Sequence, residues 1–443
     1  MKFYIIAVLL LICSNTKGQN SEVLCIDNVN VIPMSKDTIL QEHRVWVKDG
    51  KIISIEKASV PMKNEGFEII DGSGQFLIPG LAEMHYHFRS DDIVSDFKLF
   101  IANGITTVRN MAQFSGQDHI DIRNRSKSGE LIVPNYFTTG PYLTKSDLST
   151  KLDVTELVGQ HVETGFDFLK IADNLTDSIY MKLLQESQKF KLPVIGHAQR
   201  HLPLEYSLRM NSIEHIEEFV YLNDEMDGMP LMEKNVSGLQ AVARQIKQSG
   251  IYLGTTLTVF EFINNCLNDQ KFEEYKTDTL SLYVANEQRD NFLTEKNDYR
   301  KLRNKTFNGI KAPDLFKDQF SWMKKFVKIL SDNGVNLISG SDTYGMVVVG
   351  FSLHRELELL QQAGISPYEV LLSSTVAPAR YLNTISTEGT ISIGKNANMV
   401  LLAKNPLDNI NNTRTINGVI VRGKWFNKKQ LNGMLEDVAN AYK

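Results

Sequence analysis

Two histidines separated by one residue are the part of this sequence best suited to bind a metal ion. His85 and His87 end the run Phe76-Leu-Ile-Pro-Gly-Leu-Ala-Glu-Met-His-Tyr-His. In an extended strand alternate side chains share a face, so both imidazoles would project the same way. Imidazole nitrogens are common zinc ligands, so the pattern indicates a metal site. A polar strand edge is the alternative, and residues further along the chain must decide between the two.

Four more side chains that could bind metal or move protons follow short apolar runs: Lys170, His197, His215 and Asp342. Each has a structural alternative. The lysine could extend to the surface, one histidine could be satisfied in the core and the other exposed, and the aspartate could cap a helix. Six such residues at the ends of predicted strands are harder to explain in this way. We therefore predict that they form one site.

Short apolar strands alternate with amphipathic stretches through the middle of the chain. The predicted strands are 77–84, 106–109, 135–139, 168–171, 194–196, 212–214, 252–255 and 337–339, and the clearest predicted helices are 152–163, 178–190 and 239–249. Eight strands separated by helices predict an α/β fold, a (β/α)8 TIM-like barrel over residues 79–384. In such a barrel the chemistry lies at the carboxyl ends of the strands.

One interval, residues 259 to about 320, is too long and too charged to be a simple loop. We predict a helical excursion over the barrel mouth there, with a surface decoration as the alternative. Residues 23–78 and the last part of the chain have a different pattern, with short alternating apolar runs and a hairpin turn at Asp49-Gly50. Two β-rich ends therefore flank the middle of the chain.

The first residues have the pattern of a secretory signal. Met1-Lys2 is followed by an apolar run to Cys13 and then by small and polar residues, so we predict a signal peptide over residues 1–18 and an exported protein, periplasmic or secreted. Ile12 before Cys13 argues against a lipoprotein. Cys25 and Cys266 remain, and we favour two buried free thiols over one disulfide bridge. The net charge of -4 shows no basic excess for binding nucleic acid, and no later segment predicts a membrane span.

Together these motifs resemble the metal-dependent amidohydrolase superfamily over nearly the whole mature chain. The resemblance is carried by Phe76–His87, 104–109, 338–343, 353–358, 375–380 and 389–400. It implies a barrel with a small composite β-sandwich built from residues 19–78 and 385–443.

The segment Phe166-Asp-Phe-Leu-Lys-Ile resembles the fourth strand of the binuclear branch, in which the lysine carries a carbamate made from carbon dioxide. A lysine whose pKa falls by burial can react in this way and become an anionic ligand. The resemblance implies two divalent metal ions, one on His85 and His87 and the other on His197 and His215. Lys170 would bridge them, and Asp342 would bind the first. Zinc suits these ligands, with manganese, iron or nickel as alternatives.

Two cations that share a water lower its pKa, so that a bridging hydroxide can attack a carbonyl that the second metal polarises. Asp342 would be the catalytic residue, as the general base that passes the proton to the leaving nitrogen. A deaminase is the first alternative, because related barrels deaminate nucleobases. Those carry a glutamate shortly after the fifth-strand histidine, whereas His197 is followed by Ala-Gln-Arg200, and they do not need Lys170. Both features argue against deamination.

The closest subgroup by pattern is similar to imidazolonepropionases and to dipeptidases acting on Xaa-Pro or Xaa-Arg substrates. Polar and aromatic residues near the rim are candidate substrate contacts: Arg109, Tyr142, Gln199, Arg200, Glu217, Glu218, Tyr221 and Tyr344. Glu217 or Glu218 could hold a substrate ammonium and Arg200 a carboxylate, which would suit a dipeptide. Solvated loop charges are the alternative.

Three residues depart from the family pattern. Asn110 and Gln199 stand where an aspartate and a second histidine are common, and Gln199 could mark altered substrate contacts. Asn398 replaces an aspartate far from the site, where we expect no harm. His354, in a motif common to the subgroup, could be functional or structural.

Two functions of different classes follow from these observations. The first is hydrolysis of the amide bond of a small substrate, such as a dipeptide or an N-acyl amino acid, with cyclic amide, lactone or phosphoester hydrolysis as variants of the same chemistry. The second is a barrel with a vestigial metal site that only binds a ligand. The complete ligand set favours the first function. The sequence leaves open whether the protein forms a homo-oligomer.

Overall fold

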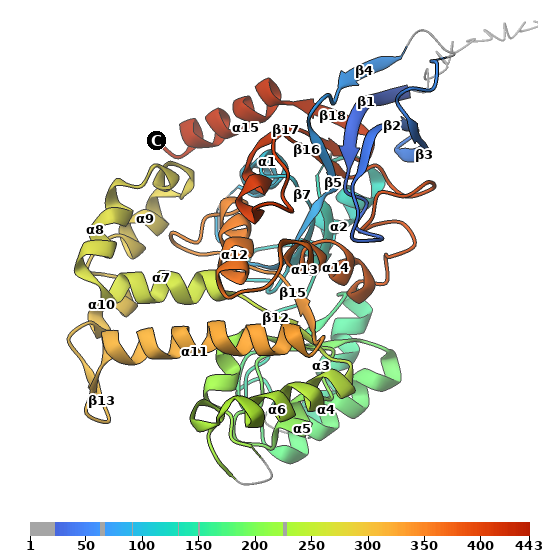
Figure 1. The fold of residues 1–443 in the computed structure, drawn as a ribbon. Helices are drawn as coiled ribbons and strands as arrows, with labels where there is room; N and C mark the ends of the chain where they lie inside the picture. The colour runs from blue at the N-terminus through green and yellow to red at the C-terminus, as the bar shows by residue number, and fades with distance from the viewer. Residues whose placement is uncertain (1–22, 63–66, 91, 132, 149–150, 225–227) are drawn as a thin grey trace, which may run out of the picture.

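The computed structural model of the protein describes residues 23–62, 67–90, 92–131, 133–148, 151–224 and 228–443. The predicted signal peptide, residues 1–18, lies outside these ranges, and so does Cys13. Short strands form the centre of the fold and helices surround them, while strands from both chain ends form a separate sheet (Figure 1).

Eight parallel strands form the central layer. They make a three-stranded sheet in the order β6-β7-β8 and a five-stranded sheet in the order β15-β12-β11-β10-β9. Their bounds are β6 Leu81–Tyr86, β7 Ile105–Asn110, β8 Asn135–Thr138, β9 Leu169–Ile171, β10 Val194–Gly196, β11 Ser212–Glu214, β12 Tyr252–Gly254 and β15 Asn336–Ile338. The first predicted strand, 77–84, is divided between β5 (Phe76–Pro79) and β6.

The two sheets approach a barrel without a continuous ladder between them. Single parallel bridges, Thr139 to Phe168 and Leu143 to Ile171, link the chain after β8 to β9. At the other gap, between β6 and β15, the Met84 N–H donates to the Ser339 carbonyl at 3.0 Å. The fold is therefore TIM-barrel-like and α/β, but the hydrogen-bond ladders of the described residues do not close it, which corrects the closed barrel that we predicted.

Helices cover the outside of these strands. Helix α6 (Val236–Ser249) shows why, because its buried residues Leu239, Val242, Ala243 and Ile246 form one apolar stripe. The Asn235 side chain caps its first turn. The other helices that accompany the central strands are α1 Ile93–Ala102, α2 His119–Ser128, α3 Lys151–Thr164, α4 Asp177–Phe190, α5 Leu204–Ser207, η1 Ile216–Val220, η2 Leu231–Glu233, α12 Phe351–Gln362, α13 Pro367–Ser373 and α14 Val376–Tyr381.

Between β12 and β15 the chain makes a long helical excursion. Its elements are α7 Leu257–Leu267, α8 Asp269–Thr277, η3 Thr279–Tyr283, α9 Asn286–Phe292, α10 Asp298–Leu302, the hairpin β13 Thr306–Phe307 and β14 Ile310–Lys311, and α11 Ala312–Asp332. Helices α7 and α11 lie side by side (Figure 1). Phe262, Cys266 and Phe272 belong to a hydrophobic cluster that also includes Met346, Val347 and Val348 from the loop after β15. The excursion is therefore a packed part of the fold rather than a loose loop.

Strands from both chain ends form one mixed sheet. Its order is β18-β17-β16-β5-β1-β2-β3, with β4 paired to β1. The predicted β-sandwich is not confirmed, because a sandwich needs two facing sheets and these strands are joined in one. The remaining bounds are β1 Val23–Val31, β2 Leu40–Lys48, β3 Lys51–Lys57, β4 Glu68–Asp71, β16 Met399–Leu402, η4 Ile410–Arg414, β17 Ile416–Val421, β18 Lys424–Asn427 and α15 Lys428–Ala441.

Asn398, directly before β16, stands where the family resemblance leads us to expect aspartate. Its Nδ2 donates to both oxygens of Glu388, at 3.0 and 3.2 Å, and its Oδ1 accepts the Arg422 N–H at 2.7 Å. We expect Asn398→Asp to lower the free energy of unfolding by about 2 kcal/mol, because two carboxylates would then face each other. Urea denaturation measures the change. Adding Glu388→Gln should recover most of it, and an unchanged loss in the double variant would contradict this explanation.

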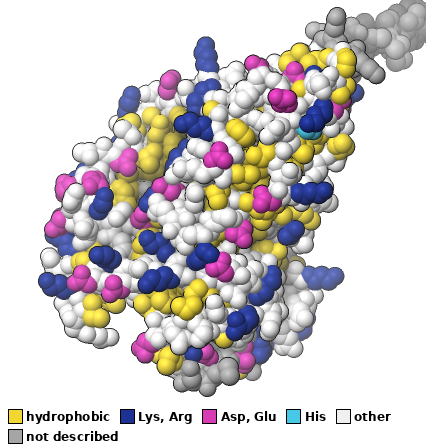
Figure 2. Space-filling model, in the orientation of Figure 1, with side chains coloured by type: hydrophobic (Ala, Val, Ile, Leu, Met, Phe, Trp, Pro, Cys, Tyr) yellow, Lys and Arg dark blue, Asp and Glu magenta, His cyan; other side chains and the backbone are white. Residues whose placement is uncertain are grey.

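The cysteines and the surface complete the fold. Cys25 and Cys266 are both buried and free. On the face shown in Figure 2, basic and acidic side chains are interspersed rather than gathered into a patch of one sign. In the described part of the chain, no helix combines the length and the apolar character that crossing a bilayer requires.

Candidate metal centre

Three of the predicted ligands form a tight group at the carboxyl ends of the central strands. The ligand atoms of His85, His87 and Asp342 all lie within 4.8 Å of one another. Asp342 Oδ1 is 3.2 Å from His87 Nε2 and 3.7 Å from His85 Nε2. Lys170 Nζ, from β9, is 3.3 Å from His85 Nε2. Residues from β6, β9 and the loop after β15 therefore meet at one point.

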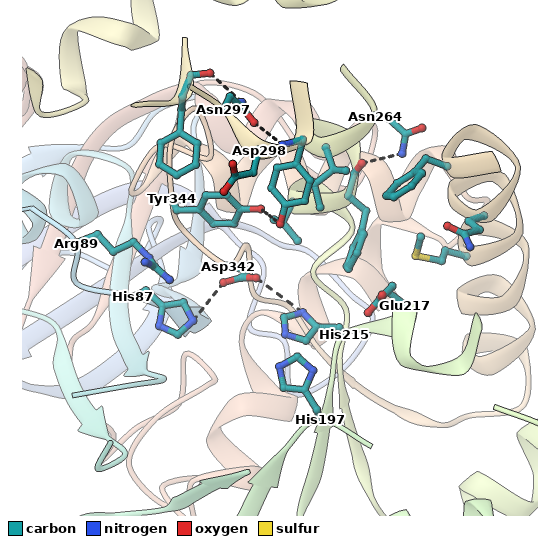
Figure 3. A pocket seen from close by; sticks show the side chains of 18 of the residues that line it. His87, Arg89, His197, His215, Glu217, Asn264, Asn297, Asp298, Asp342 and Tyr344 are labelled. Carbon is teal, nitrogen blue, oxygen red and sulfur yellow. Dashed lines mark hydrogen bonds and ion pairs between the residues drawn. The ribbon is translucent and has the colours of Figure 1, made fainter. Parts of the chain in front are cut away.

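The other two histidines lie next to this group. The ring centroid of His215 is 4.6 Å from that of His85 and 4.9 Å from that of His197. The second Asp342 oxygen is 4.0 Å from His215 Nδ1. Asp342 thus lies between His87 and His215, with His197 beyond (Figure 3). All six predicted ligands are brought together.

The backbone is left-handed at three points of this rim, with φ of 72° at His215, 46° at Thr256 and 58° at Asp342. Residues with a Cβ adopt this conformation rarely, at a cost of about 1–3 kcal/mol each, and such residues cluster at functional sites. Hydrogen bonds hold the turns, because the Asp342 N–H donates to the His85 carbonyl at 2.8 Å and the Thr256 hydroxyl is 2.8 Å from His215 Nδ1. The strained turns aim the side chains into the centre.

Two residues that we did not predict fix β6 against the loop that carries Asp342. The buried Glu83 carboxylate accepts the N–H groups of His85 and Ser341, both at 2.9 Å, and the Ser341 hydroxyl at 2.6 Å. At Gly340 a Cβ would lie 2.6 Å from the His85 nitrogen, so only glycine allows this approach. The signal for Glu83 was an acidic residue inside an otherwise apolar strand.

Three of the four histidines have their Nδ1 atom held by a neighbour. His85 Nδ1 is 3.2 Å from Glu214 Oε2, and His197 Nδ1 is 2.6 Å from Glu218 Oε1. Thr256 holds His215 in the same way. Ligating histidines in metalloproteins are oriented by such partners, which leave Nε2 for the metal. The side chains therefore fit a metal centre in their orientation as well as in their type.

Arg109 supports this arrangement from the core and is not among the residues that line the cavity, where we expected a substrate contact. Its side chain is fully buried and donates to both oxygens of Glu214, at 2.8 Å each, and to the Met84 carbonyl at 2.7 Å. Burial alone would raise the pKa of Glu214, but the Arg109 charge outweighs it and holds that pKa well below its usual range. Arg109 thus keeps ionised the carboxylate that orients His85.

The charge states suit metal binding. Burial, and then the charge of Lys170, lowers the pKa of His85 and of His87 to about 3, so both rings are neutral at pH 7. Burial also lowers the pKa of Lys170 to about 8. Burial would raise the pKa of Asp342, but the surrounding imidazoles outweigh it and hold that pKa well below its usual range. Neutral histidines and an ionised carboxylate are the forms that bind cations.

A cavity of about 820 Å³ opens above the cluster. Its walls include four of the predicted substrate residues, Tyr142, Glu217, Tyr221 and Tyr344. The Tyr142 hydroxyl is 3.4 Å from the ring nitrogens of His87. Arg200 also lines the cavity, but its guanidinium is already paired and is therefore a poor candidate for binding a substrate carboxylate. Its guanidinium already donates to Glu218 at 2.8 and 2.9 Å and to Glu217 at 3.2 Å, and it stacks on Tyr221.

Two further candidates lie away from the cavity. Gln199 is fully buried, accepts the Leu175 N–H at 2.7 Å and donates to the Asp173 carbonyl at 3.1 Å, so its side chain braces a loop instead of contacting substrate. The His354 ring nitrogens are 2.9 Å from Thr413 Oγ1 and 3.0 Å from the Asn103 carbonyl oxygen. These contacts tie α12 to η4 and to the end of α1, which is a structural role.

Arg89 is a cavity residue that we did not predict. Its guanidinium carbon lies 5.0 Å from the ring centroid of Phe114 and 5.8 Å from that of Tyr344, and it points toward the centre (Figure 3). In the described part of the chain no carboxylate lies within 4.0 Å of it. The signal was its position two residues after His87, in the same alternation as His85 and His87.

Known proteins resemble this chain over short segments of sequence and over most of the fold. An N-acetylglucosamine-6-phosphate deacetylase of Lysinibacillus sphaericus is 29% identical over 146 residues, 32% of this chain and 34% of that protein. A dihydroorotase of Carboxydothermus hydrogenoformans is 36% identical over 91 residues, 19% of this chain and 20% of that protein. The chain thus matches about a fifth to a third of the length of these curated relatives.

Solved structures match the fold at low sequence identity. A Xaa-Pro dipeptidase with bound methionine has a TM-score of 0.67 and 17% identity, covering 92% of this chain and 100% of that one. A bottromycin amidohydrolase has a TM-score of 0.72 and 18% identity, covering 94% and 90%. The family model described as Amidohydrolase family matches residues 76–426, which include all six candidate ligands. Because this match spans most of the sequence, the chain belongs to the Amidohydrolase family.

Proposed function

We propose that the protein is an exported metal-dependent hydrolase that cleaves the C–N bond of a small substrate, such as a dipeptide or an N-acyl amino acid. The observation that carries this proposal is the Asp342 carboxylate, which lies between His87 and His215 at the floor of the cavity. Export rests on the signal pattern of residues 1–18.

The side chains fit two divalent cations, for which zinc is the simplest choice. His85, His87 and Asp342 would hold one cation, and His197 and His215 the other. Imidazoles and a carboxylate match the preferred ligands of zinc.

Lys170 would bridge the cations as a carbamate. Its buried ammonium has no carboxylate within 4.0 Å in the described part of the chain, and it faces His85 instead. A buried charge without a partner is unfavourable. The ammonium would first lose a proton, and the neutral amine would then react with carbon dioxide and release a second proton. The carbamate anion so formed would replace the cation, and two metal ions would stabilise it.

Bound cations would acidify a water molecule and polarise the scissile carbonyl. Asp342, ionised because its pKa is well below the usual range, can accept a proton on a carboxylate oxygen and pass it to the leaving nitrogen. Tyr142, whose hydroxyl lies beside His87, can donate a hydrogen bond to the substrate. The excursion covers the cavity with residues such as Tyr299 and Phe316 and limits the access of bulk water.

Charged groups at the two ends of the cavity favour a zwitterionic substrate. Arg89 and Glu217 lie on opposite sides of Asp342 (Figure 3). Arg89 can bind a substrate carboxylate. Glu217, which shares Arg200 with Glu218 and has the longer contact of 3.2 Å, can bind an ammonium group. An amide bond above Asp342 with a charge at each end describes a dipeptide. The experiment must separate dipeptide hydrolysis from two alternatives. One is hydrolysis of a cyclic amide, a lactone or a phosphoester, and the other is ligand binding without catalysis.

Replacing Arg89 by methionine tests this assignment. With metal-reconstituted protein, we expect Arg89→Met to raise KM for a dipeptide about 30-fold, because a charge-assisted hydrogen bond contributes about 2 kcal/mol. The same dipeptide with an amidated carboxyl end should show little difference between the two proteins. An equal effect on both substrates would contradict the role of Arg89. If neither the wild-type protein nor the variant hydrolysed any member of dipeptide and N-acyl amino acid libraries, the proposed function would be contradicted.

A further inference from the structure

We propose that the amino-terminal residue of the substrate has a large apolar side chain, and that helices α7 and α11 select it. This inference rests on the proposed function, because it assigns a substrate class to the same cavity. The apolar patch consists of Phe260 and Ile263 on α7 and Phe316 and Met323 on α11, all of which line the cavity.

The patch follows from the geometry of the two helices. Phe260 and Ile263 are three residues apart, and Phe316 and Met323 are seven apart, so each pair lies on one face of its helix. Helices α7 and α11 pack against each other, which brings the two faces to the same wall. Phe260 and Phe316 are only partly buried, so parts of their rings remain exposed to the cavity.

The metal ligands and the charged groups do not require such a wall. The six candidate ligands lie on the central strands and the loops that follow them, whereas the patch belongs to α7 and α11. Ligand cavities combine apolar walls that bind the apolar part of a ligand with a few polar groups that orient it. The amides of Asn264 on α7 and Gln319 on α11 also line the cavity, so the apolar patch is part of a mixed wall. An apolar patch above a charged floor therefore indicates an apolar group on the substrate.

The position of the patch shows which residue of the substrate would contact it. The Phe260 ring centroid is 6.2 Å from that of His215, so the patch begins on the His215 side of the centre. Glu217 is on the same side, on η1, which packs against α11. Arg89 lies on the His87 side (Figure 3). The apolar side chain and the ammonium therefore belong to the same residue, the amino-terminal one, and the carboxylate to the other.

The test compares dipeptides that differ only in their first residue. We expect kcat/KM for Phe-Gly to exceed that for Ala-Gly and for Lys-Gly by about 100-fold, the range that a fitted apolar pocket provides. Phe260→Ala should lower kcat/KM for Phe-Gly by about 30-fold and that for Ala-Gly by less than about 3-fold. Phe316→Ala, on the other helix, provides a second variant should the first fail to fold. Phe307→Ala, an exposed phenylalanine on hairpin strand β13, is the matched control and should change neither value.

A binding measurement separates this inference from the proposed function. Titration calorimetry with the amino acids alone should show that L-phenylalanine binds at least about 10-fold more tightly than L-alanine, and that Phe260→Ala removes the difference. Hydrolysis of Phe-Gly and Ala-Gly at equal rates, or a preference that survives both Phe260→Ala and Phe316→Ala, would overturn the inference and leave the proposed function intact. No hydrolysis of any dipeptide would overturn the proposed function. In that case, equal binding of L-phenylalanine and L-alanine would also overturn the inference that the patch selects an apolar side chain. Tighter binding of L-phenylalanine would support that inference.

Discussion

Replacing Asp342 by asparagine is expected to lower kcat about 1000-fold, while the metal content and KM stay near their wild-type values. Asparagine has the same shape and tolerates the left-handed backbone, φ 58°, at this position. It cannot accept the proton that Asp342 would carry to the leaving nitrogen, and general acid–base catalysis contributes about 100- to 10,000-fold. Steady-state kinetics and metal analysis of the same preparation measure the two quantities.

The control for this variant is Asp332→Asn, at the exposed end of α11, where the carboxylate pairs with Lys328. It should change neither kcat nor metal content. A near wild-type kcat in Asp342→Asn would show that another group moves the proton. Loss of metal together with loss of turnover would show that Asp342 acts mainly as a ligand.

The second large effect is expected at Glu214, which the metal ions would not contact. Glu214 orients His85 through Nδ1, and loss of such a partner weakens metal binding about 10- to 100-fold in other metal sites. We expect Glu214→Gln to weaken metal binding by about 10-fold. It should also lower the free energy of unfolding by about 3–5 kcal/mol, because Arg109 would be left buried without its partner.

A double variant separates these two effects. Arg109→Met/Glu214→Leu removes both buried charges and replaces them with apolar groups next to Phe168 and Tyr381. The free energy of unfolding should return close to the wild-type value, while metal binding, measured by competition with a chelator, should stay weakened by at least about 10-fold. Wild-type metal affinity in the double variant would show that Glu214 serves stability alone.

Much of the candidate metal centre could be predicted from the sequence, because its candidate ligands follow local rules. His85 and His87 share a strand face, and Lys170, His197 and His215 stand at or directly after short apolar strands whose carboxyl ends meet on one side. The strands themselves were visible as apolar runs of the right length. The family resemblance then indicated how these residues divide between two cations.

The supporting residues could not be predicted in the same way, because their roles depend on contacts between distant segments. Arg109 was predicted to contact substrate as a charged residue at the end of β7, but its side chain turns into the core, where Glu214 from β11 neutralises it. Glu83 and Gly340 join segments more than 250 residues apart, since Glu83 accepts from Ser341. The patch on α7 and α11 likewise arises only when the two helices pack.

Strand pairing was the least predictable part of the fold. Several strands of the chain ends were recognisable as short apolar runs, but the order β18-β17-β16-β5-β1-β2-β3 depends on hydrogen bonds between residues far apart in the chain. The same holds for the barrel, whose β8 and β9 are linked by single bridges. Local patterns fix which residues are extended, and long-range contacts decide which strands become neighbours.

Metal analysis of the protein, purified with bicarbonate and supplied with zinc, tests the central claim most directly. Two equivalents of metal per chain are predicted, because the cluster offers four imidazoles, Asp342 and Lys170. Lys170→Ala should lower this number, and the wild-type protein with two equivalents should hydrolyse a dipeptide. Fewer than one equivalent per chain, with no hydrolysis of any dipeptide, would contradict the account.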